Sequence, residues 1–104
     1  MPPEITEENK QPIHVLVVDD EPPIREMMEI LFTKAGYSCI TADNGDSALD
    51  VLQSYSIDVA ITDINMPGIS GVELLRKGRE ITDADFIVIT GYVEDFSYET
   101  LIAE

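Results

Sequence analysis

Four oxygen-bearing side chains stand where short apolar runs of this 104-residue chain end: Asp19, Asp20, Asp63 and Thr90. Runs this short, bounded by turn residues and separated by helix-length segments, are typical of buried strands in a parallel sheet. The carboxyl ends of such strands share one edge of the sheet, and ligands bind at that edge. We therefore expect the four side chains to converge. Three carboxylates and one hydroxyl in one crevice predict a divalent cation and phosphoryl chemistry.

Asp19 and Asp20 are adjacent carboxylates, which lose solvation and repel each other unless a positive charge neutralises them. Oxygen-rich sites of this kind suit Mg²⁺, which takes one or two carboxylates and keeps several waters. Taken alone, the pair fits a solvated acidic turn equally well, stabilised by the dipole of the following helix. Asp63 favours the metal site, because it ends a different strand that should reach the same edge.

Asp63 and Thr90 indicate what such a site would do. A carboxylate beside a bound cation can attack a phosphoryl group and form an acyl phosphate. Thr90 could donate its hydroxyl to a phosphoryl oxygen, and Gly91 beside it leaves room for the group. Taken alone, a threonine in this position is more often a helix cap or a strand-end filler.

Alternating strand-like and helix-like segments must position these residues. The apolar runs predict strands at about 13–18, 37–41, 57–62 and 86–89, the second of mixed polarity as at a sheet edge. The other segments predict helices that begin near Pro22 or Pro23, after the turn at 43–46, near Ser70 and near Glu94. This alternation predicts a doubly wound α/β sandwich.

Apolar residues at helical spacing indicate which helix faces enter the core. In the first helix, which Gly36 should end, we expect core packing for Ile24, Met27, Met28, Leu31 and Ala35. In the later helices, the expected inner residues are Ala48, Val51, Leu52, Val72, Leu75, Leu101 and Ile102.

Composition limits the class of protein. The formal net charge of −15 argues against direct nucleic-acid binding by this segment. We expect residues 1–12 to be a disordered lead and residues 13–104 to form one domain. No apolar stretch approaches the ~18 residues of a membrane span, so we expect a soluble, cytoplasmic segment. The single cysteine, Cys39, excludes an internal disulfide and is expected to be a small buried hydrophobe.

Three motifs follow one another with compatible spacings: Val17-Val18-Asp19-Asp20-Glu21-Pro22, Ile61-Thr62-Asp63-Ile64-Asn65-Met66-Pro67-Gly68 and Val88-Ile89-Thr90-Gly91. Together they resemble the receiver domain of two-component response regulators, over the stretch from Ile13 to Glu104. The resemblance implies the flavodoxin-like receiver fold, with strand order 2-1-3-4-5.

The resemblance also implies a role for each site residue. Asp63 would be the phosphoacceptor. Asp20 would bind Mg²⁺ directly, Asp19 mainly through a water, and the backbone carbonyl of Asn65 would be a further ligand. Thr90 would hydrogen-bond the phosphoryl group and act as the switch.

The family's phosphoryl donor is a histidine kinase or a histidine phosphotransfer protein, and its output is a partner or an attached domain. The resemblance thus implies a signalling switch that promotes only its own phosphorylation and dephosphorylation, rather than a metabolic enzyme.

One departure from the family concerns its lysine, which follows a fifth strand. Lys10, Lys34 and Lys77 do not follow such a strand, and the expected lysine would fall beyond Glu104. We therefore expect the fifth strand and fifth helix to be missing from this chain. The fourth strand would then be an unpaired edge that favours dimers or domain-swapped assemblies, and this segment alone would be phosphorylated weakly or not at all.

Two other functions compete with the phosphorylated switch. A degenerate receiver could act as a phosphorylation-independent interaction module, which the missing lysine leaves open. An aspartate-based phosphohydrolase usually carries a second acid two positions after its nucleophile, whereas Asn65 stands there after Asp63. His14 lies in the first expected strand, away from the carboxyl edge, so we expect it to take no part in the site.

Overall fold

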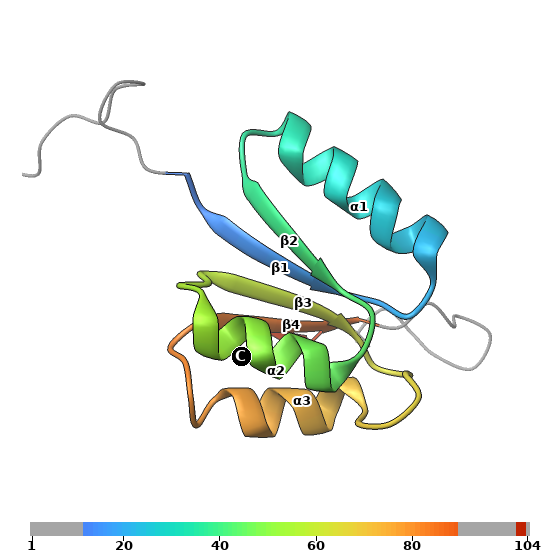
Figure 1. Cartoon of the computed structure of the whole chain (residues 1–104), viewed down its shortest axis with the longest axis vertical. Coiled ribbons are helices and arrows are strands. Elements are labelled where there is room, and N and C mark those ends of the chain that lie inside the picture. The colour runs from blue at the N-terminus through green and yellow to red at the C-terminus, as the bar shows by residue number, and fades with distance from the viewer. Residues whose placement is uncertain (1–11, 90–101, 104) are drawn as a thin grey trace, which may run out of the picture.

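A computed structural model of the chain describes residues 12–89 together with the backbone of residues 102–103. Within residues 12–89, strands and helices alternate in the order β1 (His14–Val18), α1 (Pro22–Lys34), β2 (Ser38–Ala42), α2 (Gly45–Ser54), β3 (Val59–Asp63), α3 (Gly71–Gly78) and β4 (Asp85–Ile89). These strands pair in parallel in the order β2-β1-β3-β4 (Figure 1). The predicted parallel α/β sheet, with the second strand at its edge, is confirmed.

Local sequence signals set the helix boundaries. Pro22 and Pro23 open α1, where their missing N–H groups would have no helical partner. Gly36 follows the helix with a φ of 98°, a left-handed conformation that glycine adopts without steric cost. Side-chain oxygens of Asn44 and Ser70 accept backbone N–H groups at the starts of α2 and α3. These caps fix where α2 and α3 begin.

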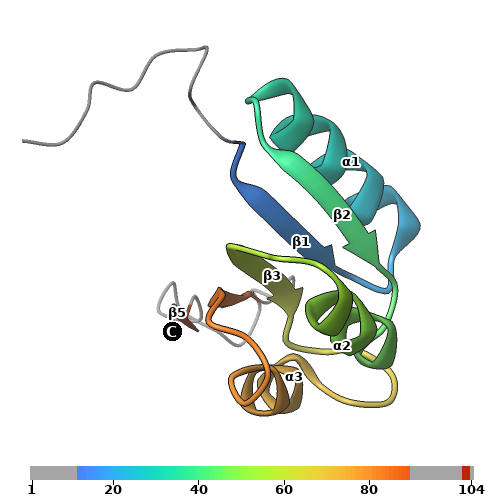
Figure 2. The ribbon, with the colours of Figure 1, turned by 60° about the vertical axis from the view of Figure 1, so that its left-hand side comes forward.

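Helices α2 and α3 cover one face of the sheet, while α1 lies over β1 and β2 on the other face (Figure 2). The core under α2 and α3 contains Leu16, Leu74 and Phe86, each fully buried. Of the expected inner residues, Ala48, Leu52 and Leu75 are buried, whereas Val51 and Val72 are half-buried. Leu74 was not among the expected core residues.

Helix α1 contradicts the prediction that its apolar stripe packs into the core. None of its residues is buried: Met27 is 49% exposed and Leu31 58% exposed, and Met28 is half-buried. Ile24 and Ala35 are exposed as well. Within residues 12–89, α1 is the one helix on its face of the sheet, and a single helix leaves its flanks open to solvent. No helix in these residues is long and apolar enough to cross a membrane.

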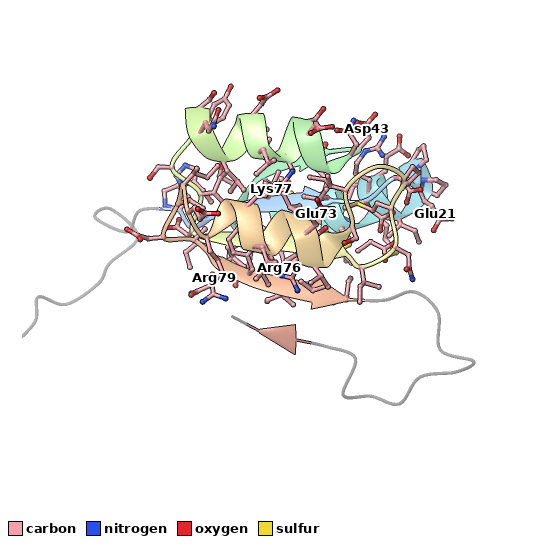
Figure 3. All side chains as sticks on the ribbon, turned by 90° about the horizontal axis from the view of Figure 1, so that it is seen from below. Glu21, Asp43, Glu73, Arg76, Lys77 and Arg79 are labelled. Atoms are coloured by element: carbon pink, nitrogen blue, oxygen red, sulfur yellow. The ribbon has the colours of Figure 1, made fainter. Side chains whose placement is uncertain are left out.

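A short fifth strand, β5 (Ile102–Ala103), corrects two further expectations. Ile102 lies in a strand and not on a helix face, and the edge of β4 is partly covered instead of unpaired. β5 runs antiparallel to β4, as the opposed arrows in Figure 3 show. Val88 is paired with Ile102. The free N–H and C=O groups of an edge strand favour such pairing. The helix expected near Glu94, together with Leu101, lies outside the described residues.

Candidate functional site

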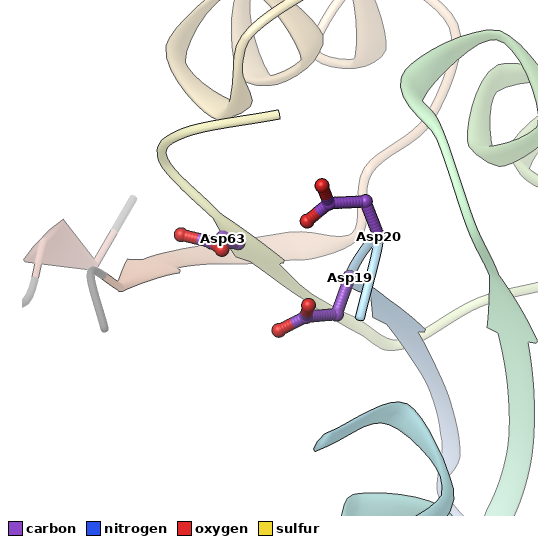
Figure 4. A group of neighbouring side chains, drawn as sticks. All are labelled: Asp19, Asp20 and Asp63. Atoms are coloured by element: carbon purple, nitrogen blue, oxygen red, sulfur yellow. The ribbon is translucent and has the colours of Figure 1, made fainter. Parts of the chain in front are cut away.

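Three carboxylates meet at the carboxyl edge of the sheet. Asp19 follows β1, Asp20 comes next, and Asp63 is the last residue of β3. Each offers an oxygen, and these oxygens all lie within 4.8 Å of one another (Figure 4). The register explains the meeting, because Val18 is paired with Thr62, so the next residue after each of them, Asp19 and Asp63, lies at the same edge of the sheet. The predicted convergence is confirmed for these three residues, and Thr90 lies outside the described residues.

Three atoms of Asp19 take part in hydrogen bonds. Its N–H donates to the carbonyl of Ala42 at 3.1 Å. Its Oδ1 accepts the N–H of Glu21 at 2.9 Å, and its own carbonyl accepts Nη1 of Arg25 at 2.8 Å. Asp19 is only 5% exposed. The β1–α1 loop therefore presents its first carboxylate from a fixed backbone.

Hydrogen bonds to Asp63 and to the next residue, Ile64, fix the end of β3. Oδ1 of Asp63 accepts the N–H of Asn65 at 3.2 Å. The next residue, Ile64, donates its N–H to Ile89 of β4 and accepts the N–H of Gly71 at 3.0 Å. A Cβ atom on Gly71 would strike the carbonyl oxygen of Asp63, so the start of α3 reaches this strand end only because it is glycine.

Electrostatics distinguish Asp63 from an ordinary aspartate. Partial burial, which disfavours the charged form, raises the pKa of Asp63, and the neighbouring Asp19 and Asp20 raise it further. The backbone N–H groups of Asn65 and Ile64 act in the opposite direction and lower it. Oxygens from three carboxylates are the donors that a hard divalent cation such as Mg²⁺ takes, so the residues present fit the predicted metal. A bound cation would also relieve the repulsion among them.

The other candidate residues lie away from this group. His14, at the start of β1, donates its N–H to Oδ2 of Asp58 at 2.8 Å, on the opposite edge of the sheet. Cys39 is half-buried in β2, and burial, followed by the charge of Glu29, raises the pKa of its thiol. A protonated thiol is a poor nucleophile, which agrees with the structural role expected for Cys39.

A groove of about 760 Å³ also lies on the opposite edge, lined by residues that include Tyr55, Asp58, Asp83 and Asp85. It contains none of the three carboxylates, so this groove and the candidate site are at different edges of the sheet.

Two contributors to the site were not anticipated from sequence. Arg25 contacts the Asp19 carbonyl, and Gly71 allows α3 to approach Asp63. The sequence could have indicated this role for Arg25, because side chains in the first turn of a helix point back towards the helix start. Nothing local marks Gly71, since its role depends on the distance between two elements.

Comparison with known proteins agrees with this arrangement. The family model for the response regulator receiver domain matches residues 15–103. The probable transcriptional regulator ycf27 of Cyanidium caldarium is 39% identical over 83 residues, which make up 80% of this chain and 33% of that protein. The chain spans about a third of the length of this protein and of two other curated transcriptional regulators that it matches.

Solved structures give the same result. The response regulator TrrA of Thermotoga maritima, in complex with Mg²⁺-BeF, is 44% identical with a TM-score of 0.73, covering 77% of this chain and 70% of that one. A structure of the histidine kinase ThkA in complex with TrrA matches at 42% identity and a TM-score of 0.73, covering 85% of this chain and 77% of that chain. The sheet order, the carboxylate cluster and these matches together show that the chain belongs to the response regulator receiver domain family.

Proposed function

We propose that the chain is a phosphorelay receiver that accepts a phosphoryl group on Asp63 in a Mg²⁺-dependent reaction. The observation that carries this proposal is the meeting of Asp63 with Asp19 and Asp20 within 4.8 Å. The donor is the phosphohistidine of a histidine kinase or a histidine phosphotransfer protein. In the transfer, a bond forms between phosphorus and a carboxylate oxygen of Asp63, and the phosphorus–nitrogen bond to the histidine breaks.

The residues of the site have different roles in binding the metal and the phosphoryl group. Asp20, Asp63 and the backbone carbonyl of Asn65 would hold Mg²⁺, and Asp19 would contribute mainly through a water. When bound, the cation supplies positive charge that offsets the negative charge on the reacting oxygens. The Asn65 N–H, which donates to Asp63 at 3.2 Å, orients the nucleophilic carboxylate. Thr90 donates its hydroxyl to the transferred phosphoryl group and acts as the switch.

Two features of relatives support the metal and the donor. TrrA was crystallised with Mg²⁺-BeF, and the second structure holds TrrA together with the histidine kinase ThkA. We infer the same classes of ligand and partner here. Residues 13–104 belong to a receiver domain that works in the cytoplasm and reports to an output domain or partner protein without binding nucleic acid itself. It promotes only its own phosphorylation and dephosphorylation.

Intact-mass analysis after incubation with Mg²⁺ and acetyl phosphate tests the proposal. The samples are this chain, Asp63→Asn, Asp58→Asn as the control at the opposite edge, and a longer form carrying about 20 further residues for one more strand and helix. We expect one phosphoryl adduct in the longer form that requires Mg²⁺ and Asp63 and survives Asp58→Asn. An adduct on this chain as well would show that the further residues are dispensable. No adduct in either form would favour an interaction module that works without phosphorylation.

A further inference from the structure

We propose that Arg25 is a positioning residue for the metal site: its guanidinium holds the Asp19 carbonyl so that the carboxylates of Asp19 and Asp20 face Asp63. This inference rests on the proposed Mg²⁺-dependent function. Nη1 of Arg25 donates to the Asp19 carbonyl oxygen at 2.8 Å. The Arg25 side chain is half-buried, whereas Arg76 and Lys77 on α3 are exposed.

The contact acts on the one peptide group that links the two metal-facing residues. The Asp19 carbonyl belongs to the peptide bond with Asp20, so fixing that oxygen fixes the direction in which the Asp20 backbone leaves. The Arg25 backbone is tied to the same loop, because its N–H donates to the carbonyl of Glu21 at 3.0 Å. Arg25 thus joins the first turn of α1 to the loop through both its main chain and its side chain.

The alternative to positioning is an effect of charge, and the two predict opposite results. A guanidinium close to the site repels a second cation, so removal of its charge alone would tighten Mg²⁺ binding. Loss of the hydrogen bond to Asp19 would instead let the loop rotate its carboxylates away from Asp63, which weakens binding. Groups that orient metal ligands commonly change metal affinity by about tenfold or more when they are removed.

The test is a Mg²⁺ titration of the chain followed by ¹⁵N NMR, well below the melting temperature of each variant. Arg25→Met removes both the charge and the donor, Arg25→Lys keeps the charge but not the planar fork, and Arg76→Met is the matched control for net charge. We expect Arg25→Met to raise the dissociation constant about tenfold, Arg25→Lys to raise it less, and Arg76→Met to leave it unchanged. The Glu21 amide, which donates to Asp19, should shift in Arg25→Met even without Mg²⁺.

An unchanged or lower dissociation constant in Arg25→Met would overturn the positioning role, whatever happens to stability. If Arg25→Met does not fold, Arg25→Lys decides, and a dissociation constant equal to that of the wild type overturns the proposal. Wild-type binding that Asp63→Asn does not weaken would instead overturn the proposed metal site itself, and the role of Arg25 with it. The two failures are therefore distinguishable.

Discussion

The two edges of the sheet both carry carboxylates, yet they are built differently. At the carboxyl edge, Asp19, Asp20 and Asp63 bring their oxygens within 4.8 Å of one another. At the amino edge, the Asp58 carboxylate accepts the His14 N–H and lies 3.7 Å from Nδ1 of the same residue. Within residues 12–89, the three-carboxylate group occurs at the carboxyl edge alone.

This difference shows that the number of acidic residues does not make a site. Asp58 has a donor beside it, and about half of each side chain in the His14–Asp58 pair is exposed, so water screens the pair. Asp63 instead is partly buried and has two like charges beside it, and both raise its pKa. Groups whose pKa is shifted by burial and by like charges cluster at functional sites.

The largest expected contrast between the two edges is chemical. Asp63→Asn should abolish the Mg²⁺-dependent phosphoryl adduct, because an amide nitrogen and oxygen cannot replace the attacking carboxylate. Asp58→Asn, which makes the same change at the amino edge, should leave the adduct yield unchanged. The measurement is intact mass on the form of the protein that is phosphorylated. An adduct that persists in Asp63→Asn would place the acceptor elsewhere.

A pair of glycine substitutions in α3 separates site geometry from packing. A methyl group on Gly71 would strike the Asp63 carbonyl, whereas one on Gly78 would meet the Phe86 ring towards the amino edge. Each should destabilise the fold by about 2 kcal/mol in urea unfolding. Only Gly71→Ala should also weaken Mg²⁺ binding, since it displaces the Asp63 backbone. Equal Mg²⁺ affinity in the two variants would contradict this account.

The raised pKa of Asp63 gives a smaller effect with a defined sign. Because the folded chain holds this proton more tightly than the unfolded chain, the contribution of Asp63 to the free energy of unfolding rises as the pH falls through its folded pKa. At pH 7, Asp63→Asn should therefore be more stable than the wild type, by about 0.5 kcal/mol for a partly exposed group. Urea unfolding between pH 4 and 7 should show this difference shrinking as the pH falls. A difference that grows on acidification would reverse the assigned direction.

The smallest effect is expected at the amino edge. His14→Gln removes an imidazole that is 3.7 Å from the Asp58 carboxylate, but it keeps the backbone N–H that donates to that carboxylate. Exposed pairs of this kind contribute about 0.5 kcal/mol or less, so thermal unfolding should hardly change and Mg²⁺ affinity should not change at all. A loss comparable to that of Gly71→Ala would mean that the amino edge is more tightly built than its exposure indicates.

The elements and the meeting of the carboxylates were predictable from local rules. Apolar runs at Val15–Val18 and Val59–Thr62 predict adjacent strand ends, and the pairing of Val18 with Thr62 produces the convergence. The packing of α1 was not predictable in this way. Its apolar stripe follows helical spacing, but burial depends on whether a neighbouring element covers that flank, and Leu31 remains 58% exposed.

The sequence by itself therefore determined the alternating α/β order up to β4, the carboxylates that stand at the ends of β1 and β3, and the family to which the chain belongs. The tertiary structure alone decided that Arg25 reaches the Asp19 carbonyl, that Gly71 permits α3 to approach Asp63, and that Ile102 pairs with β4 as an antiparallel strand. The physical reason is one of range. Strand and helix signals act between residues a few positions apart, whereas these contacts depend on the distance between elements that only the packed fold establishes.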